Sequence, residues 1–392
     1  MGTEPICRHS RGVPVSHLDD LFALGAEFAR REVFPDLQDW EDAGSVPRAL
    51  HATAAKQGLM GVGFPEDVGG EGGTLRDVVA LNEGMLSEGA SSGLLAALFT
   101  SGIALPHIAH HGSAALVDAY VRPTLAGERI GSLAITEPDG GSDVSHLRTA
   151  AVLDGDHYVV NGAKTFITSG VRADFVTTAV RTGGPGAGGV SLLVIDKSTD
   201  GFTVTRSLRK MGWHCSDTAE LSFVDARVPA SNLVGEENAG FGYIAEAFVT
   251  ERIALAVQAY GIAARSLALT AAYCRDRETF GKPLVSRQVV RHKLVEMHRQ
   301  VEVAKAYTHA VVDRYDRTGP TAESIAEAAL AKQTAVEASQ WVCNEAVQLH
   351  GGTGYMHGTE VERHYRDTRI LPIGGGATEV MTDLAAKLLG FT

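Results

Sequence analysis

Three long helical patterns fill the last third of the chain and constrain its fold more than any other feature. They span residues 241–275, 285–315 and 321–350 and are rich in Ala, Val, Leu, Glu and Arg. Each is well above the average helix length of about 11–12 residues. Long helices this apolar usually pack against one another, so we expect a helical bundle over residues 237–392.

The middle of the chain has the period of β-strands instead. Residues 149–153 and 157–160 flank Asp154-Gly155, a pair typical of a hairpin turn. Further strands are expected at residues 175–180, 190–195, 202–206 and 219–224. Short strands with turns at this spacing predict a small β-barrel or sandwich over residues 132–236.

Helical spacing also marks the first third of the chain. Apolar residues recur at helical intervals in residues 18–24 and 78–81, and Gly and Pro clusters interrupt them. The predicted fold class is therefore α+β. We expect a helical domain over residues 1–131, then the β domain, then the C-terminal helical bundle.

The charge balance and the apolar stretches limit the partners of the protein. The chain carries 35 Lys and Arg against 47 Asp and Glu, a net charge of −12, which argues against nucleic acid as a partner. No apolar stretch reaches the ~20 clean residues that a membrane span needs, so no membrane partner is predicted. Residues Met1–Pro5 lack the order of a signal peptide, and a cytoplasmic protein is expected.

Several motifs are interpreted as structural. Gly184–Gly189 matches G-x-G-x-x-G but lies between two expected strands, which favours a hairpin loop over a dinucleotide site. His107 and His111 could share a helix face, but no third ligand accompanies them and no metal site is predicted. The cysteines form no C-x-x-C motif and no expected disulfide framework; they are Cys7, Cys215, Cys274 and Cys343.

Four segments have a composition suited to binding a ligand. Residues 135–143 and 166–170 combine hydroxyls with small residues, and residues 277–284, followed by Gln288, place two cations and a glycine between helices. Residues 348–355 carry three glycines in four positions, and such backbone can hold a pyrophosphate. Each segment alone also fits a plainer structure: a capped turn, a strand end, a helix C-cap or an inter-helix loop.

In this order, the segments resemble the acyl-CoA dehydrogenase family over nearly the whole chain. The resemblance implies an N-terminal helical domain, a β-barrel domain, a C-terminal four-helix bundle, non-covalent FAD and a homotetramer. The motifs that carry it are Thr136-Glu137-Pro138, Gly141-Ser142-Asp143, Phe166-Ile167-Thr168, Lys210-Met211-Gly212, Arg277-x-x-Phe280-Gly281-Lys282, Gln348-x-x-Gly351-Gly352-x-Gly354-Tyr355 and Arg366-Asp367.

The resemblance also assigns roles by position. It places Thr136 and Thr168 at the flavin ring, with Phe166 and Glu379 also in the cofactor site, and it places Ser142 and Arg252 at the acyl-CoA. The residues implied at the FAD pyrophosphate and adenosine, across a subunit interface, are Arg277, Thr279, Phe280 and Gln288. Gln348 and Gly352 are implied as the matching contacts from the other side of the same dinucleotide site.

The catalytic base is the point on which the sequence departs from most of the family. The chemistry removes an α-proton from a thioester and passes a β-hydride to flavin N5, so it needs a carboxylate near the α-carbon. Gly375 occupies the place of the usual glutamate. Glu251 precedes the family's active-site arginine, which resembles the isovaleryl-CoA and long-chain branches, where the base comes from this helix.

Two interpretations of Glu251 follow from the residues around it. Apolar neighbours on its helix face would desolvate the carboxylate and raise its pKa, as a base requires. Alternatively, Glu251 forms a buried ion pair with an arginine on another helix. We favour the base, with the backbone N–H of Gly375 polarising the thioester carbonyl. Ala377 replaces a threonine that usually helps to hold the flavin, at a cost of about 0.5–1.5 kcal/mol.

The predicted function is FAD-dependent α,β-dehydrogenation of an acyl-CoA, with electrons passing to an electron-transferring flavoprotein. Three alternatives remain open: a dehydrogenase of thioesters on an acyl-carrier protein, a flavin oxidase or monooxygenase of the same fold, and a non-catalytic flavin-binding relative. The glycines at 374–376 leave room near the α-carbon, which permits branched or bulky acyl groups.

Overall fold

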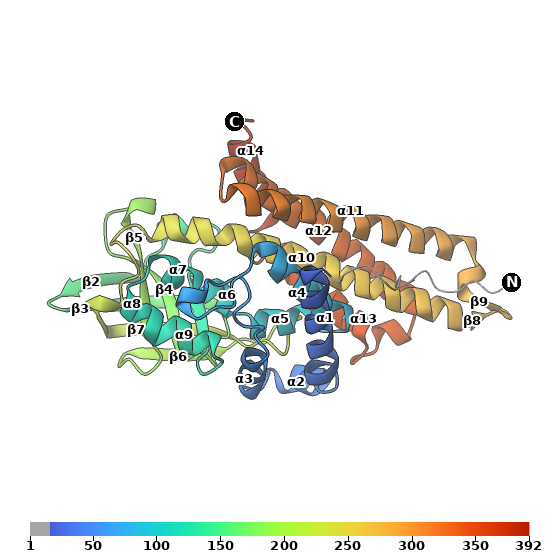
Figure 1. Ribbon diagram of the computed structural model, residues 1–392, viewed down its shortest axis with the longest axis horizontal. Helices are drawn as coiled ribbons and strands as arrows, with labels where there is room; N and C mark the ends of the chain where they lie inside the picture. Colours follow the sequence, from blue (N-terminus) through green and yellow to red (C-terminus); the bar gives the residue numbers. More distant parts are fainter. Residues whose placement is uncertain (1–15, 392) are drawn as a thin grey trace.

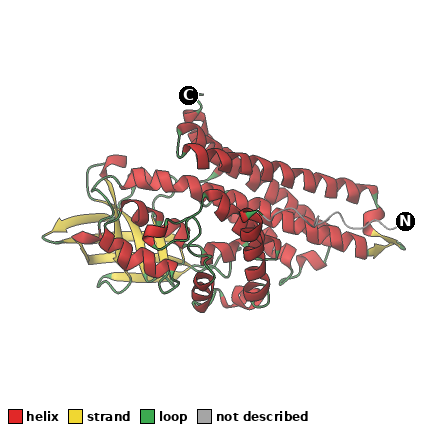
Figure 2. Ribbon diagram, viewed as in Figure 1, coloured by secondary structure: helices red, strands yellow, loops and turns green. Residues whose placement is uncertain are grey.

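A computed structural model describes residues 16–391 of the chain, with a curled sheet at one end and long helices at the other (Figures 1 and 2). The expectations about Met1–Pro5 and Cys7 lie outside the described residues. The order of helical, β and helical parts that the sequence predicts is confirmed.

The N-terminal part consists of short helices. Ser16 begins the first of them through a reciprocal capping box with Asp19, and Thr74 begins α4 in the same way with Asp77. The helices are α1 His17–Phe28, α2 Leu37–Ala43, α3 Ala49–Lys56, α4 Leu75–Ser87, α5 Ser92–Leu98, α6 Ser101–Ala104, α7 Pro106–His111, α8 Ala114–Leu116 and α9 Arg122–Leu125. The helices α1 and α4 pack against each other, and α4 also packs on the C-terminal helices.

The middle part is one curled sheet of seven strands. The strands are β1 Gly131–Ala134, β2 Ala150–Asp154, β3 His157–Thr168, β4 Phe175–Arg181, β5 Val190–Asp196, β6 Phe202–Ser207 and β7 Thr218–Pro229. Their order is β1-β4-β2-β3-β7-β6, with β5 antiparallel to β4. The expected strands and the β2–β3 hairpin are confirmed, and Gly155 takes φ +63° in its turn. Residues 184–189 form the β4–β5 loop, as expected.

The C-terminal part is built on three long helices, as expected. These are α10 Gly240–Asp276, α11 Gln288–Thr318 and α12 Ala322–His350, and they pack against one another. The remaining elements are the hairpin strands β8 Glu278–Thr279 and β9 Lys282–Pro283, α13 Glu360–Asp367 and α14 Thr378–Leu388. The short helix α14 packs on α12 and is the fourth helix of the bundle.

Single turns of other helix types connect these elements. The turns of 3₁₀-helix are Glu66–Val68, Val144–His146, Ala187–Gly189, Ala230–Asn232, Leu284–Ser286, Thr353–Tyr355 and Thr368–Ile370. Two π-helical turns, Ala29–Val33 and Val117–Val121, extend N-terminal helices.

The helix α10 runs from the curled sheet to the β8–β9 hairpin and links the two ends of the molecule (Figure 1). By length and composition it is apolar enough to cross a membrane, which corrects the expectation that no stretch is. In its most apolar window, 61% of the residues are buried inside the protein. Helices α4, α11 and α12 pack against it, as expected for the central helix of a bundle.

Candidate active site

The two segments predicted at the flavin ring lie side by side. The backbone N–H of Thr165 donates to the carbonyl of Thr136 at 2.9 Å, and the hydroxyl of Ser132 donates to the carbonyl of Thr168 at 2.5 Å. The ends of β1 and β3 are thereby joined. The segments that carry Thr136 and Thr168 therefore lie next to each other, and the contacts of these two residues with the flavin stay a prediction.

A buried ion pair fixes these segments to each other. Lys164 is fully buried, and its Nζ lies 2.8 Å from Oε1 of Glu137 and 2.9 Å from the carbonyl oxygen of Ile135. Burial lowers the pKa of Lys164 to about 8, against the opposing charge of Glu137. Glu137 also accepts from the backbone N–H groups of Arg148 and Thr149. Breaking one side of such a pair usually costs about 3–5 kcal/mol, so this corner is rigid.

Phe166 combines a strained backbone conformation with an exposed side chain. The pairing of β3 with β7 shifts register between Lys164 and Ile167, and Phe166 there takes φ +59° with 68% of its surface exposed. A non-glycine residue in this region is strained. An exposed aromatic ring held in this way fits a flat ligand beside Thr168. Ser142 lies on the neighbouring exposed turn.

Glu251 lies on α10, partly buried and without a partner. Among residues 16–391, no side chain or backbone group forms a hydrogen bond or ion pair with its carboxylate, so the predicted alternative of an ion pair with an arginine on another helix is absent there. Burial raises its pKa, and the charges of Lys332 and Arg252 oppose that effect. Phe248, one turn earlier, packs in the same apolar cluster as Ile135. Glu251 therefore lies one helical turn from a residue of the cluster that also contains Ile135, the neighbour of Thr136 in the chain.

Gly375 faces this carboxylate directly. A Cβ atom at Gly375 would lie 3.2 Å from Oε1 of Glu251 and 2.4 Å from Cδ1 of Leu255, and the residue takes φ +62°. Its backbone N–H donates no hydrogen bond to any group between residues 16 and 391. The place of the usual glutamate and the place of Glu251 thus open onto the same space, with a free N–H donor beside the carboxylate.

Lys332 on α12 holds the glycine loop and was not predicted. It is only 2% exposed, and its Nζ donates to the carbonyls of Gly374 at 2.5 Å and Gly376 at 2.6 Å. The sequence contains one signal for this residue, a single lysine among alanines at Ala331-Lys332 of an apolar helix. A lysine on a buried helix usually has a polar partner.

Arg252 follows Glu251 and is also buried. It is 7% exposed, its guanidinium lies 5.7 Å from the centre of the Phe248 ring, and its Nε has no hydrogen-bond partner among the described residues. Burial lowers the pKa of Arg252, against the opposing charge of Glu251. An unsatisfied buried donor next to the carboxylate is consistent with a contact to a bound ligand.

The Arg277 segment forms an exposed hairpin at the far end of α10. Phe280 at its tip is 99% exposed with φ +51°, and Arg287 donates to the carbonyl of Thr279 at 2.6 Å. Arg277 caps α10, and Gln288 begins α11. An apolar ring so fully exposed is suited to insertion into another surface.

The Gln348 segment lies at this same end of the bundle. Tyr273 stacks on His350 with 4.4 Å between ring centres and donates to its carbonyl. A Cβ at Gly352 would meet no atom within 4 Å, so the loop is open to a ligand. The resemblance implies Arg277 and Gln348 on opposite sides of one site, whereas the structure places both at one end of one protomer. The Arg277 and Gln348 segments of one protomer therefore cannot contact a dinucleotide from two sides. A second protomer would have to supply the other side of the site.

Glu379 is the last of the predicted site residues. It is exposed in the first turn of α14, four residues after Gly375.

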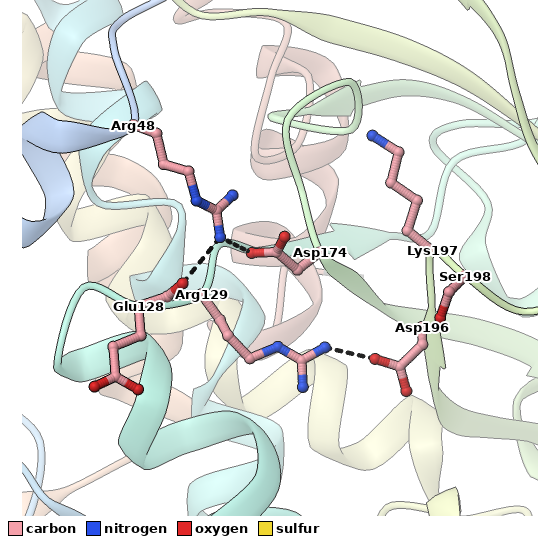
Figure 3. Close-up of a pocket in the computed structure, with 7 residues that line it drawn as sticks. All are labelled: Arg48, Glu128, Arg129, Asp174, Asp196, Lys197 and Ser198. Carbon is pink, nitrogen blue, oxygen red and sulfur yellow. Dashed lines mark hydrogen bonds and ion pairs between the residues drawn. The ribbon is translucent and has the colours of Figure 1, made fainter.

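A hollow of about 520 Å³ lies elsewhere in the protein, between the N-terminal helices and the sheet (Figure 3). It is lined by Arg48, Glu128, Arg129, Asp174, Asp196, Lys197 and Ser198. Ion pairs of Arg48 with Asp174 and of Arg129 with Asp196 cross it. None of the predicted site residues lines it, so we interpret it as a charged seam between the two parts.

Three family models match consecutive parts of the chain. They describe the N-terminal, middle and C-terminal domains of acyl-CoA dehydrogenase and match residues 19–128, 132–226 and 238–390. The mitochondrial long-chain specific acyl-CoA dehydrogenase of Sus scrofa is 38% identical over 366 residues, which cover 92% of this chain and 84% of the relative.

Solved structures give the same result. A probable acyl-CoA dehydrogenase from Mycobacterium abscessus is 60% identical with a TM-score of 0.93, over 95% of this chain and 98% of that one. A glutaryl-CoA dehydrogenase from Mycobacterium smegmatis in complex with FADH2 is 25% identical with a TM-score of 0.89, over 96% and 95%.

These findings define a flavin-dependent oxidoreductase. The chain belongs to the acyl-CoA dehydrogenase family, whose activity is the flavin-dependent oxidation of acyl-CoA, and its cofactor is FAD. The strained, exposed Phe166 and the open glycine backbone at Gly352 fit such a cofactor.

The fit of Gly375 against Glu251 can be tested by adding one methyl group. Gly375→Ala must place a Cβ at positive φ and against Leu255, so we expect it to lower the free energy of unfolding by about 1–3 kcal/mol. Gly374→Ala is the matched control, because its Cβ would meet nothing closer than 3.7 Å. Thermal unfolding of the two variants measures the difference. Equal melting temperatures would contradict the described packing of the loop.

Proposed function

We propose that the protein desaturates an acyl-CoA thioester between its α- and β-carbons, with Glu251 as the base. The observation that carries the proposal is the unpaired carboxylate of Glu251 facing Gly375. A partly buried carboxylate without a partner is costly, and the most direct reason for keeping it is a proton to be moved at this place.

The residues of the chain divide the chemistry between them. Glu251 takes the α-proton, and its raised pKa improves its strength as a base. The free N–H of Gly375 donates to the thioester carbonyl, where negative charge develops as the proton leaves. Bound FAD supplies the acceptor for the hydride of the β-carbon. Thr136 and Thr168 would hold the flavin ring, with Phe166 in contact with it, and Arg252 and Ser142 would position the acyl-CoA.

The cofactor site is completed by a second protomer. From Glu251 to the end of α10 there are 25 residues, a length of roughly 37 Å, which exceeds the reach of one flavin dinucleotide. Arg277, Phe280 and Gln348 of one protomer would therefore hold one part of an FAD whose flavin Thr136 and Thr168 of another protomer would hold. Symmetric pairing of this kind gives two equivalent sites per dimer, and two such dimers give the homotetramer.

The redox partner and the substrate class follow from the same proposal. Electrons leave to an electron-transferring flavoprotein, so reduced flavin should react slowly with oxygen. Rapid reoxidation by oxygen would instead identify a flavin oxidase, and activity with a carrier-protein thioester but not with acyl-CoA would identify the carrier-linked alternative.

Removal of the base should separate cofactor binding from chemistry. Glu251→Gln should bind FAD like the wild type but bleach it at least ~10²-fold more slowly when mixed anaerobically with a panel of acyl-CoAs. Glu246→Gln, an exposed position on the same helix, is the control and should bleach normally. Wild-type bleaching by Glu251→Gln would show that the base lies elsewhere.

The shared cofactor site can be tested by mixing two inactive proteins. Arg277→Glu should lose FAD affinity, and Glu251→Gln should lose the base. When the two are unfolded and refolded together with FAD, half of the dimers are hybrids with one intact site each, so about a quarter of the wild-type activity should return. Refolding each variant alone is the control. No recovery in the mixture, with hybrids verified by mass, would mean that each site is built from one chain.

A further inference from the structure

We propose that Lys332 is a positioning residue that aims the N–H of Gly375 at the substrate carbonyl and places a positive charge near Glu251. This inference rests on the proposed function and adds to it a residue on a different helix, α12. The observations that carry it are the two hydrogen bonds of Lys332 to the loop around Gly375 and the close approach of that loop to Glu251.

The peptide group between Gly374 and Gly375 has the geometry that a positioning role requires. Lys332 Nζ donates to the carbonyl of Gly374, and that carbonyl belongs to the same peptide unit as the N–H of Gly375. In a trans peptide, the C=O and the N–H point in opposite directions. An ammonium group on the oxygen therefore fixes the direction of the N–H away from α12, and it also polarises the peptide so that the N–H is a stronger donor.

The second bond of Lys332 fixes the other side of the same residue. Its Nζ also donates to the carbonyl of Gly376, so the loop is clamped on both sides of Gly375. Three consecutive glycines have little conformational preference of their own. A clamp is thus needed if Gly375 is to stay at φ +62° against Leu255.

The positive charge of Lys332 also acts on Glu251. Two cations act on Glu251, Arg252 from its own helix and Lys332 from α12, and both lower a pKa that burial raises. Neither lies within 4 Å of the carboxylate, so neither blocks the proton acceptor. Lys332 is buried and its charge is poorly screened. Its charge therefore favours the ionised form of Glu251 without forming an ion pair that a substrate would have to break.

Two substitutions separate the bonds from the charge. Lys332→Met removes both, whereas Lys332→Gln keeps an N–H donor and removes only the charge. Lys293→Met is the matched control, because Lys293 is a half-buried lysine of α11 that pairs with Glu345 of α12. The readouts are amide hydrogen exchange over residues 371–377 and the pH profile of anaerobic flavin bleaching by the acyl-CoA that reacts fastest.

In Lys332→Met we expect the amide hydrogens of the loop to exchange faster and the bound flavin to bleach more slowly. In both Lys332 variants, loss of the positive charge raises the pKa of Glu251, so the acidic limb of the profile should move up by about 1 pH unit or more. Lys332→Gln should show this shift with smaller loss of protection, and Lys293→Met should show neither change.

An acidic limb that stays in place in both variants would overturn the electrostatic role, and unchanged exchange in Lys332→Met would overturn the clamp. If Lys332→Met does not fold, Lys332→Gln alone decides the electrostatic role through the pH profile. These outcomes differ from a failure of the proposed function, in which Glu251→Gln itself bleaches at the wild-type rate.

Discussion

The site depends on a carboxylate that the fold keeps unpaired. Glu251 is partly buried, and the two cations that act on it remain beyond ion-pair distance. Such an arrangement costs free energy and is stable only because the surroundings are rigid. Apolar packing around α10 supplies part of that rigidity, and the Lys332 clamp supplies the rest at the glycine loop. The same features leave the backbone N–H of Gly375 without a partner among the described residues and next to the carboxylate, so the proposed base and the proposed carbonyl donor share one rigid support.

The length of α10 gives the molecule its second constraint. Glu251 lies in the first half of the helix, and the β8–β9 hairpin, with Phe280 at its tip, follows the other end of the helix (Figure 1). The Phe280 ring is 99% exposed in the single protomer. The proposed division of the dinucleotide site between protomers accounts for this exposure and for the open backbone at Gly352.

Periodicity predicts most of the fold, because helix and strand periods depend on local sequence. The three long helices and the β2–β3 hairpin are confirmed for that reason. Ordered motifs predict the family and name Glu251 and Gly375 as a pair, and the structure brings the two together. Lys332 could not be predicted in this way, because its partners are backbone carbonyls more than 40 residues away. The placement of Arg277 and Gln348 at one end of a protomer likewise depends on the packing of Tyr273 against His350, which no local pattern contains.

The most direct test of the account isolates proton removal from the redox step. A CoA thioester of 3,3-dimethylbutanoic acid has α-hydrogens but no β-hydrogen, so its α-protons can be removed while no hydride can leave. Incubation in D2O with the FAD-loaded enzyme, followed by mass spectrometry of the thioester, measures that step alone. The account predicts deuterium at the α-carbon with the wild type and almost none with Glu251→Gln. Incorporation at equal rates by both proteins would contradict it.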